Sequence, residues 1–180
     1  WKTESGWQPS DPTHATIKFL VRGNQLYMAA IVQDQSIGGS VEFNRFDGLL
    51  MGMKNHAELG FPKPQNENMY TWWHDELTEP QPEGTLPGFI GVWAELPHGT
   101  PRTPEQIDAW DAVTVVNGTT NNDATLDVGY TVEMRFNLTP MGYDVTQPGG
   151  DIVEWNISIY DCDWFWPISV TSFSTNRVWW

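Results

Sequence analysis

Apolar and polar residues alternate with the two-residue period of a β-strand along much of the chain. Residues 15–22 and 26–34 are two runs rich in strand-forming residues, and Gly23-Asn24-Gln25 lies between them. Because Gly and Asn tolerate positive φ angles, this arrangement predicts a β-hairpin. Alternate residues of the second run should face opposite sides of the sheet. One side would carry Tyr27, Ala29, Ile31 and Gln33, and the other Leu26, Met28, Ala30 and Val32.

Further segments of strand length, flanked by turn-forming residues, lie at 47–54, 89–96, 112–117, 129–136 and 152–161. One short helix is predicted at 104–110, because Thr103 can act as its N-cap and Pro104 occupies the first helical position. Short strands separated by turns rich in Gly, Pro and Asn are typical of an all-β domain. We therefore predict an antiparallel β-sandwich, of the jelly-roll or immunoglobulin-like two-sheet kind, with long loop insertions.

The periodicity stops between residues 55 and 88. This segment contains several prolines and acidic residues and the pair Trp72-Trp73. We interpret it as a long Pro- and Trp-rich insertion, which in a compact domain is usually functional or bound to a partner. The chain has 180 residues, the length of one ordinary domain, so residues 1–180 are expected to form a single domain.

Charge and composition exclude several classes of protein. Nine Lys and Arg stand against 23 Asp and Glu, which gives a net charge of −14 at pH 7. Such a chain repels phosphate backbones and anionic lipid surfaces, so we expect no nucleic-acid partner and no binding at a membrane surface. No apolar run approaches the roughly 18–20 residues of a membrane span, so we expect no membrane insertion. The single Cys162 excludes an internal disulfide, whereas 11 Trp residues indicate a need for flat apolar faces.

Four stretches, in this order, carry a family resemblance: 23–34 (GNQLYMAAIVQD), 46–53 (FDGLLMGM), 129–142 (GYTVEMRFNLTPMG) and 151–163 (DIVEWNISIYDCD). They resemble carbohydrate-binding module family 9 and the wider DOMON-like group of sandwich domains that bind sugars or haem. The resemblance implies a non-catalytic carbohydrate-binding domain of a secreted, periplasmic or cell-surface bacterial protein. It also implies that the native chain extends beyond both termini, and that residues 1–180 lack the first and last strands.

Sugar binding requires aromatic faces for the C–H groups of a pyranose and polar side chains for its hydroxyl groups. Trp179 and Trp180 are similar to the family's C-terminal stacking residue, with Arg177 and Asn176 as neighbouring hydroxyl partners. The family's second stacking Trp has no counterpart, so the second aromatic platform would come from Phe43, Phe46 or the Trp72-Trp73 pair.

Other roles remain open for these aromatic residues. One of two adjacent strand residues normally faces the core, Phe46 could be a core residue, and Trp72-Trp73 could dock on a partner protein. Trp164 and Trp166 would be either a binding patch or a plug at the end of the sandwich. We predict core positions for Trp93, Trp110 and Trp155, which lie in or beside predicted strands.

Acidic residues near strand ends offer hard oxygen ligands of the kind that Ca²⁺ prefers, and the resemblance supports a structural calcium ion. The candidate ligands are Asp34, Asp47, Asp161 and Asp163, with a second set, Asp123 and Asp127, in a loop that also holds Asn121 and Asn122. Asp and Asn are also ordinary turn residues, which is the competing interpretation.

No motif of a nucleophilic, zinc-dependent or phosphate-binding enzyme is present, so we expect a non-enzymatic protein. Two alternatives to sugar binding stay open. In the first, the chain is an accessory subunit that docks on a larger assembly through residues 55–88. In the second it binds haem b noncovalently, and Met51, Met53, Lys54, His56 and His74 supply the ligand types.

Overall fold

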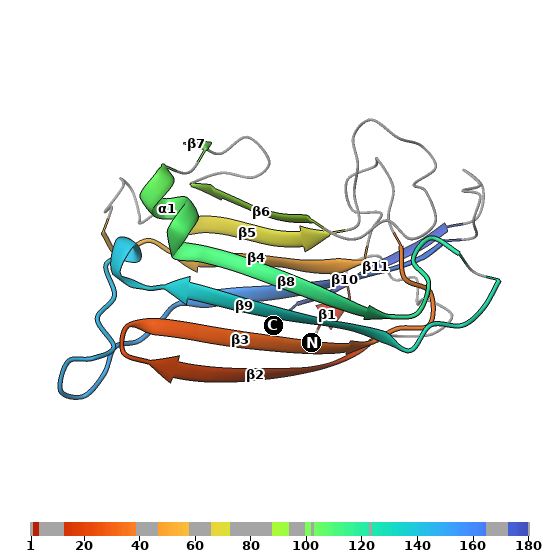
Figure 1. Cartoon of the computed structure of the whole chain (residues 1–180), viewed down its shortest axis with the longest axis horizontal. Coiled ribbons are helices and arrows are strands. Elements are labelled where there is room, and N and C mark those ends of the chain that lie inside the picture. Colours follow the sequence, from red (N-terminus) through yellow and green to blue (C-terminus); the bar gives the residue numbers. More distant parts are fainter. Residues whose placement is uncertain are drawn as a thin grey trace.

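Two antiparallel β-sheets make up the computed structural model of this chain, and their strands run along its long axis (Figure 1). The structure describes residues 2–3, 13–38, 47–57, 66–72, 88–93, 100–101, 103–122, 124–164 and 173–179. Side chains are described for 13–38, 47–57, 103–122 and 124–161. The predicted all-β, two-sheet class is confirmed.

The seven-stranded sheet has the order β1-β11-β10-β4-β5-β6-β7. Its strands are β1 (Lys2–Thr3), β4 (Gly48–Lys54), β5 (Asn66–Trp72), β6 (Gly88–Trp93), β7 (Thr100–Pro101), β10 (Trp155–Trp164) and β11 (Phe173–Trp179). The four-stranded sheet has the order β2-β3-β9-β8. Its strands are β2 (His14–Arg22), β3 (Gln25–Gln33), β8 (Trp110–Asn117) and β9 (Gly129–Asn137). One helix, α1 (Pro104–Ala109), and one 3₁₀ turn, η1 (Thr139–Met141), complete the described elements.

The strands predicted from alternation are all present, with bounds shifted by a few residues. In the β2–β3 hairpin Arg22 pairs with Gln25, and Gly23 has a φ of 58°, as the turn prediction requires. The predicted N-cap of α1 is confirmed, because Thr103 Oγ1 accepts the backbone N–H of Gln106. The Gln106 side chain in turn accepts the backbone N–H of Thr103, which completes a capping box.

One prediction needs correction. The segment 55–88, interpreted as an insertion without periodic structure, contains strand β5 (Asn66–Trp72). The first half of this strand, Asn-Glu-Asn, is polar, so the strand has no apolar alternation that would reveal it. Pairing with β4 on one side and β6 on the other places it inside the sheet.

The core lies between the two sheets, and the side of β3 that carries Leu26, Met28, Ala30 and Val32 points into it. From the four-stranded sheet it takes Leu26, Met28, Ala30, Val32, Val132, Met134 and Phe136. From the seven-stranded sheet it takes Leu49, Met51, Met53, Ile157 and Ile159. Trp110 is buried, as predicted, and Trp155 packs against the core edge-on to Phe136, with ring centroids 5.0 Å apart. Trp93 lies in β6, but its side chain is outside the described residues.

Strand β2 is an edge of the four-stranded sheet, and its second half remains open to solvent. Phe19, Leu20 and Val21 are each at least half exposed. Lys18 and Arg22, also exposed, flank this apolar triplet. This exposed apolar triplet therefore belongs to the edge of the sheet and not to the core.

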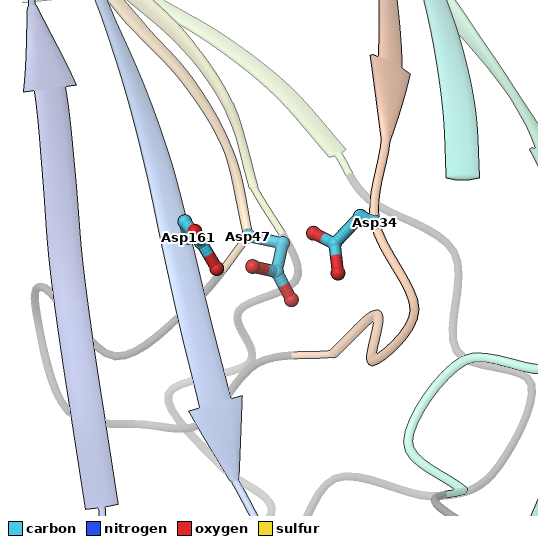
Figure 2. A group of neighbouring side chains, drawn as sticks. All are labelled: Asp34, Asp47 and Asp161. Carbon is cyan, nitrogen blue, oxygen red and sulfur yellow. The ribbon is translucent and has the colours of Figure 1, made fainter. Parts of the chain in front are cut away.

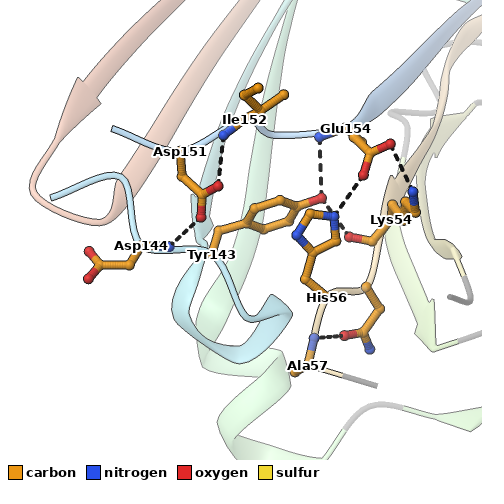
Figure 3. Close-up of polar contacts among 9 residues, drawn as sticks. Lys54, His56, Ala57, Tyr143, Asp144, Asp151, Ile152 and Glu154 are labelled. Atoms are coloured by element: carbon orange, nitrogen blue, oxygen red, sulfur yellow. Dashed lines mark hydrogen bonds and ion pairs between the residues drawn. The ribbon is translucent and has the colours of Figure 1, made fainter. Parts of the chain in front are cut away.

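A polar cluster closes the sandwich where β4 ends and β10 begins (Figure 3). Glu154 accepts from Lys54 Nζ and contacts His56 Nε2, both at 2.8 Å. The Tyr143 hydroxyl connects the backbones of Lys54 and Glu154. It donates to the Lys54 carbonyl at 2.8 Å and accepts the Glu154 backbone N–H at 3.2 Å. Burial raises the pKa of Tyr143, so this hydroxyl stays protonated near neutral pH.

Candidate metal centre

Three aspartates meet at the opposite end of the sandwich (Figure 2). Asp34 follows the last residue of β3, Asp47 precedes the first residue of β4, and Asp161 lies in β10. One carboxylate oxygen from each lies within 4.8 Å of the others, and all three residues are buried. We refer to Asp34, Asp47 and Asp161 as the aspartate triad.

Strand pairing explains why residues so distant in sequence meet here. Tyr160 pairs with Gly48, so Asp161 and Asp47 lie on neighbouring strands of the seven-stranded sheet at the same end. Asp34 comes from the four-stranded sheet, where β3 ends above that point. The triad therefore links the two sheets.

The loop at residues 34–38 holds two triad members in place through consecutive amides. The backbone N–H groups of residues 36, 37 and 38 donate to three different carboxylates, those of Asp34, Asp127 and Asp47. The N···O distances are 3.0, 3.0 and 2.7 Å, which are ordinary hydrogen-bond lengths. Hydrogen bonds to the ionised form favour carboxylate over carboxylic acid.

Two residues beside the triad had no signal in the sequence. Thr13 donates its amide to Asp161 Oδ2 at 2.9 Å and its hydroxyl to Asp34 Oδ2 at 3.4 Å. Tyr130, in β9, is buried, and burial raises its pKa well above the usual value, with the charges of Asp47, Asp34 and Asp161 adding to the rise. Tyr130 therefore stays neutral and adds no charge to the cluster.

The donor set fits a hard divalent cation. Three carboxylates buried within 4.8 Å of one another repel each other, and a cation bound among them would offset that repulsion. Ca²⁺ binds oxygen ligands at about 2.3–2.6 Å, so two ligands of one ion can stand up to roughly 5 Å apart. The triad would supply at least three of the six to eight oxygens that Ca²⁺ takes.

The second predicted calcium loop has a different arrangement. Asp127 is buried, and both of its carboxylate oxygens accept backbone amides: Ile37 N at 3.0 Å and Thr119 N at 2.6 Å. The Asn121 amide donates to the Ile37 carbonyl at 2.8 Å. Asp127 thus connects Thr119 to the 34–38 loop, and this loop in turn contacts Asp34 and Asp47 of the triad. Asp123, and the side chain of Asp163 in β10, lie outside the described residues.

The predicted sugar-contact residues fall on the seven-stranded sheet or outside the described part. Strand β11 carries Asn176, Arg177 and Trp179, whose Cα partners in β10 are Asp161, Tyr160 and Ser158. Strand β5 carries Trp72, opposite Gly48 at the triad end. The side chains of these four residues are outside the description, as are Phe43, Phe46, Trp73 and Trp180 altogether.

The residues considered for haem have other contacts. Met51 and Met53 are buried in the core between the sheets, and Lys54 and His56 are held by Glu154. His74 lies outside the described residues. Within the described part of the chain, no helix is long and apolar enough to cross a membrane.

The fold and the site define an all-β, two-sheet protein with an acidic cluster between its sheets. No protein-family model matches the sequence, and no curated protein matches it at a significant level. A solved structure described as a "putative carbohydrate-binding protein from Bacteroides uniformis" aligns with 94% of this chain and 70% of its own length, at 6% identity and a TM-score of 0.44. At that level of similarity, function has to be inferred from this chain's own residues.

Proposed function

We propose that this chain is a non-catalytic carbohydrate-binding domain whose two sheets are joined at one end by a structural calcium ion. The observation that carries the proposal is the meeting of Asp34, Asp47 and Asp161. These residues belong to three of the four stretches that resemble family 9 modules, namely 23–34, 46–53 and 151–163. The fold brings together acidic residues that the sequence leaves far apart.

In this proposal the ion supplies positive charge and cross-links the sheets, and the chain's own residues do the rest. Asp34, Asp47 and Asp161 would hold it, while Thr13 and the 34–38 loop orient their carboxylates. A secreted, periplasmic or cell-surface location suits a module of this kind, because extracellular sites work at about 10⁻⁴–10⁻³ M Ca²⁺.

Carbohydrate would bind through Trp179 and Trp180, with Phe43, Phe46, Trp72 or Trp73 as the facing platform. Asn176 and Arg177 would pair with sugar hydroxyl groups. Strands β5 and β11 place Trp72 and Asn176 in register with Gly48 and Asp161, next to the triad. A calcium ion at the triad would therefore stabilise the end of the sheet where these residues lie.

The test is a pair of calorimetric titrations on the wild-type chain, first with CaCl₂ after chelator treatment and then with neutral oligosaccharides. We expect saturable calcium binding that Asp47→Asn and Asp161→Asn each weaken about tenfold or more, since a charged ligand is lost. Asp108→Asn, which removes an exposed charge on α1, is the matched control.

The sugar half of the test uses Trp179→Ala combined with Trp180→Ala. Oligosaccharide binding whose affinity and stoichiometry are both unchanged by this double change would show that the stacking residues lie elsewhere. A wild-type chain that binds neither calcium nor any neutral glycan would refute the proposed function.

A further inference from the structure

A hollow lies on the outer face of the four-stranded sheet, whereas β5 and β11, which carry Trp72 and Trp179, belong to the other sheet. The volume of the hollow is about 230 Å³, and its side-chain walls are Tyr27 from β3, Asp111 and Val113 from β8, and Glu133 and Arg135 from β9. It is an open depression that crosses three adjacent strands.

The register of the strands sets this group of side chains. Arg135 pairs with Tyr27 on one side and with Asp111 on the other, and Glu133 pairs with Val113. Because paired residues share a face, these side chains all point away from the core. Their neighbours Met28 and Met134 point the other way and are buried between the sheets.

The charged residues of the hollow remain separate from one another. Oppositely charged residues directly across a strand pair usually interact. Arg135 instead donates from Nη2 to the Asp108 carbonyl at the end of α1, at 2.8 Å. Among the described residues, no carboxylate forms an ion pair with Arg135. Asp111 uses Oδ1 to accept the Ala112 amide at 2.8 Å.

This arrangement leaves hydrogen-bonding capacity beside an aromatic ring. A guanidinium has five N–H donors, and only one of those of Arg135 is used by Asp108. Asp111 and Glu133 are acceptors, and Tyr27 is a half-buried ring with a polar hydroxyl. A tyrosine side chain beside donors and acceptors, of which Arg135 and Asp111 are held by hydrogen bonds to the backbone, offers the groups that recognise a pyranose.

We propose that Tyr27, Asp111, Glu133 and Arg135 form a second carbohydrate-binding site, which takes one neutral sugar residue of an oligosaccharide. The proposal deepens the proposed carbohydrate-binding function and rests on it. The hollow has two carboxylates and one guanidinium, so its net charge is negative and disfavours the binding of phosphate, sulfate and uronic acids. The volume is below the roughly 300–1,000 Å³ of sites that enclose a drug-sized ligand, which suits a single sugar ring.

The experiment is calorimetric titration of the calcium-loaded chain with cellotetraose, xylotetraose, mannotetraose and laminaritetraose. We expect Tyr27→Ala to weaken binding of the recognised sugar by about tenfold, as loss of an aromatic anchor commonly does. Asp111→Asn and Glu133→Gln should each weaken it severalfold. Both residues are exposed, so these variants test the site even if Tyr27→Ala fails to fold. Val115→Ala, further along the same face of β8, is the matched control.

The outcomes separate this site from the proposed function. The second site is supported if the Trp179→Ala and Trp180→Ala double variant retains part of the binding, and if Tyr27→Ala, Asp111→Asn or Glu133→Gln reduces that remaining part. If sugar binding is unchanged in Tyr27→Ala, Asp111→Asn and Glu133→Gln, the second site is refuted, whereas the proposed function is not. If the wild-type chain binds none of the four sugars at millimolar concentration, both proposals fail.

Discussion

At the scale of single residues, Glu154 shows how one exposed carboxylate can join two segments. It accepts from Lys54 and contacts His56 after β4, while its own amide donates to Tyr143. Hydrogen bonds from Lys54 and His56 lower the pKa of Glu154 from the usual value of a glutamate. The Glu154 contacts therefore depend on pH.

We expect the stabilising effect of Glu154 to disappear in acid. Because its pKa is lower in the folded chain than in the unfolded chain, the ionised form contributes stability above the unfolded pKa. That contribution is lost as the pH falls through the folded pKa. Urea unfolding at about pH 7, 5, 4 and 3 should show wild type and Glu154→Gln converging toward the acid end. Glu133→Gln is the control, and a gap that stays constant with pH would contradict the expectation.

At the scale of elements, the 34–38 loop is ordered by carboxylates from three parts of the chain. Its consecutive amides are shared among Asp34, Asp127 and Asp47. Asp127 also accepts the Thr119 amide, so it connects the loop to the segment before β9. This loop positions two of the three triad residues.

Replacing Asp127 should therefore loosen the triad without removing any of its members. Asp127→Ala leaves the Ile37 and Thr119 amides without their acceptor, at a cost of about 1–3 kcal/mol for each buried donor. We expect lower stability in urea, faster hydrogen exchange at these two amides and weaker calcium binding. Asp127→Asn keeps one carbonyl acceptor and should lose less. Exchange rates equal to wild type in both variants would refute the role given to Asp127.

Sequence patterns were informative for elements that reveal themselves locally. Strands β2, β3 and β9 are rich in strand-forming residues between turn signals, and α1 carries its own cap, so all four could be predicted. Strand β5 could not, because its position depends on pairing with β4 and β6. Long-range pairing of this kind leaves no local signature.

The same reason limits how far the site could be predicted. Asp34, Asp47 and Asp161 were recognisable singly, as acidic residues near strand ends. That they meet depends on the pairing of β10 with β4 and on the packing of one sheet over the other. Thr13 takes part mainly through its backbone amide, and Tyr130 through burial beside the carboxylates, so neither residue type signals a cation site.

At the scale of the whole molecule, the two ends of the sandwich are closed by different chemistry. At one end the aspartate triad brings together β3 of one sheet and β4 and β10 of the other. At the other end, Glu154 and Tyr143 join the end of β4 to the start of β10. Global stability should therefore respond separately to calcium and to acid.

Calcium should raise the unfolding temperature of the whole chain. A ligand at about 100 times its Kd stabilises the folded state by about 2.7 kcal/mol. For a domain of this size that corresponds to a rise in Tm of about 5–10 °C. Scanning calorimetry in CaCl₂ and in EGTA measures the shift, which Asp47→Asn should largely abolish. An equal Tm in both solutions would show that no ion links the sheets.

The open edge at β2 has a consequence for how the protein behaves at high concentration. An exposed edge strand with an apolar triplet, Phe19-Leu20-Val21, offers a template on which a second chain could pair and aggregate. Lys18 and Arg22 flank the triplet in the manner of gatekeeper residues that oppose such pairing. The net charge of −14 adds repulsion between chains at pH 7, and this repulsion weakens as carboxylates become protonated. In mild acid the positive charges of Lys18 and Arg22 are therefore the main barrier to pairing at this edge. Replacing either residue by a neutral one should make the protein aggregate faster.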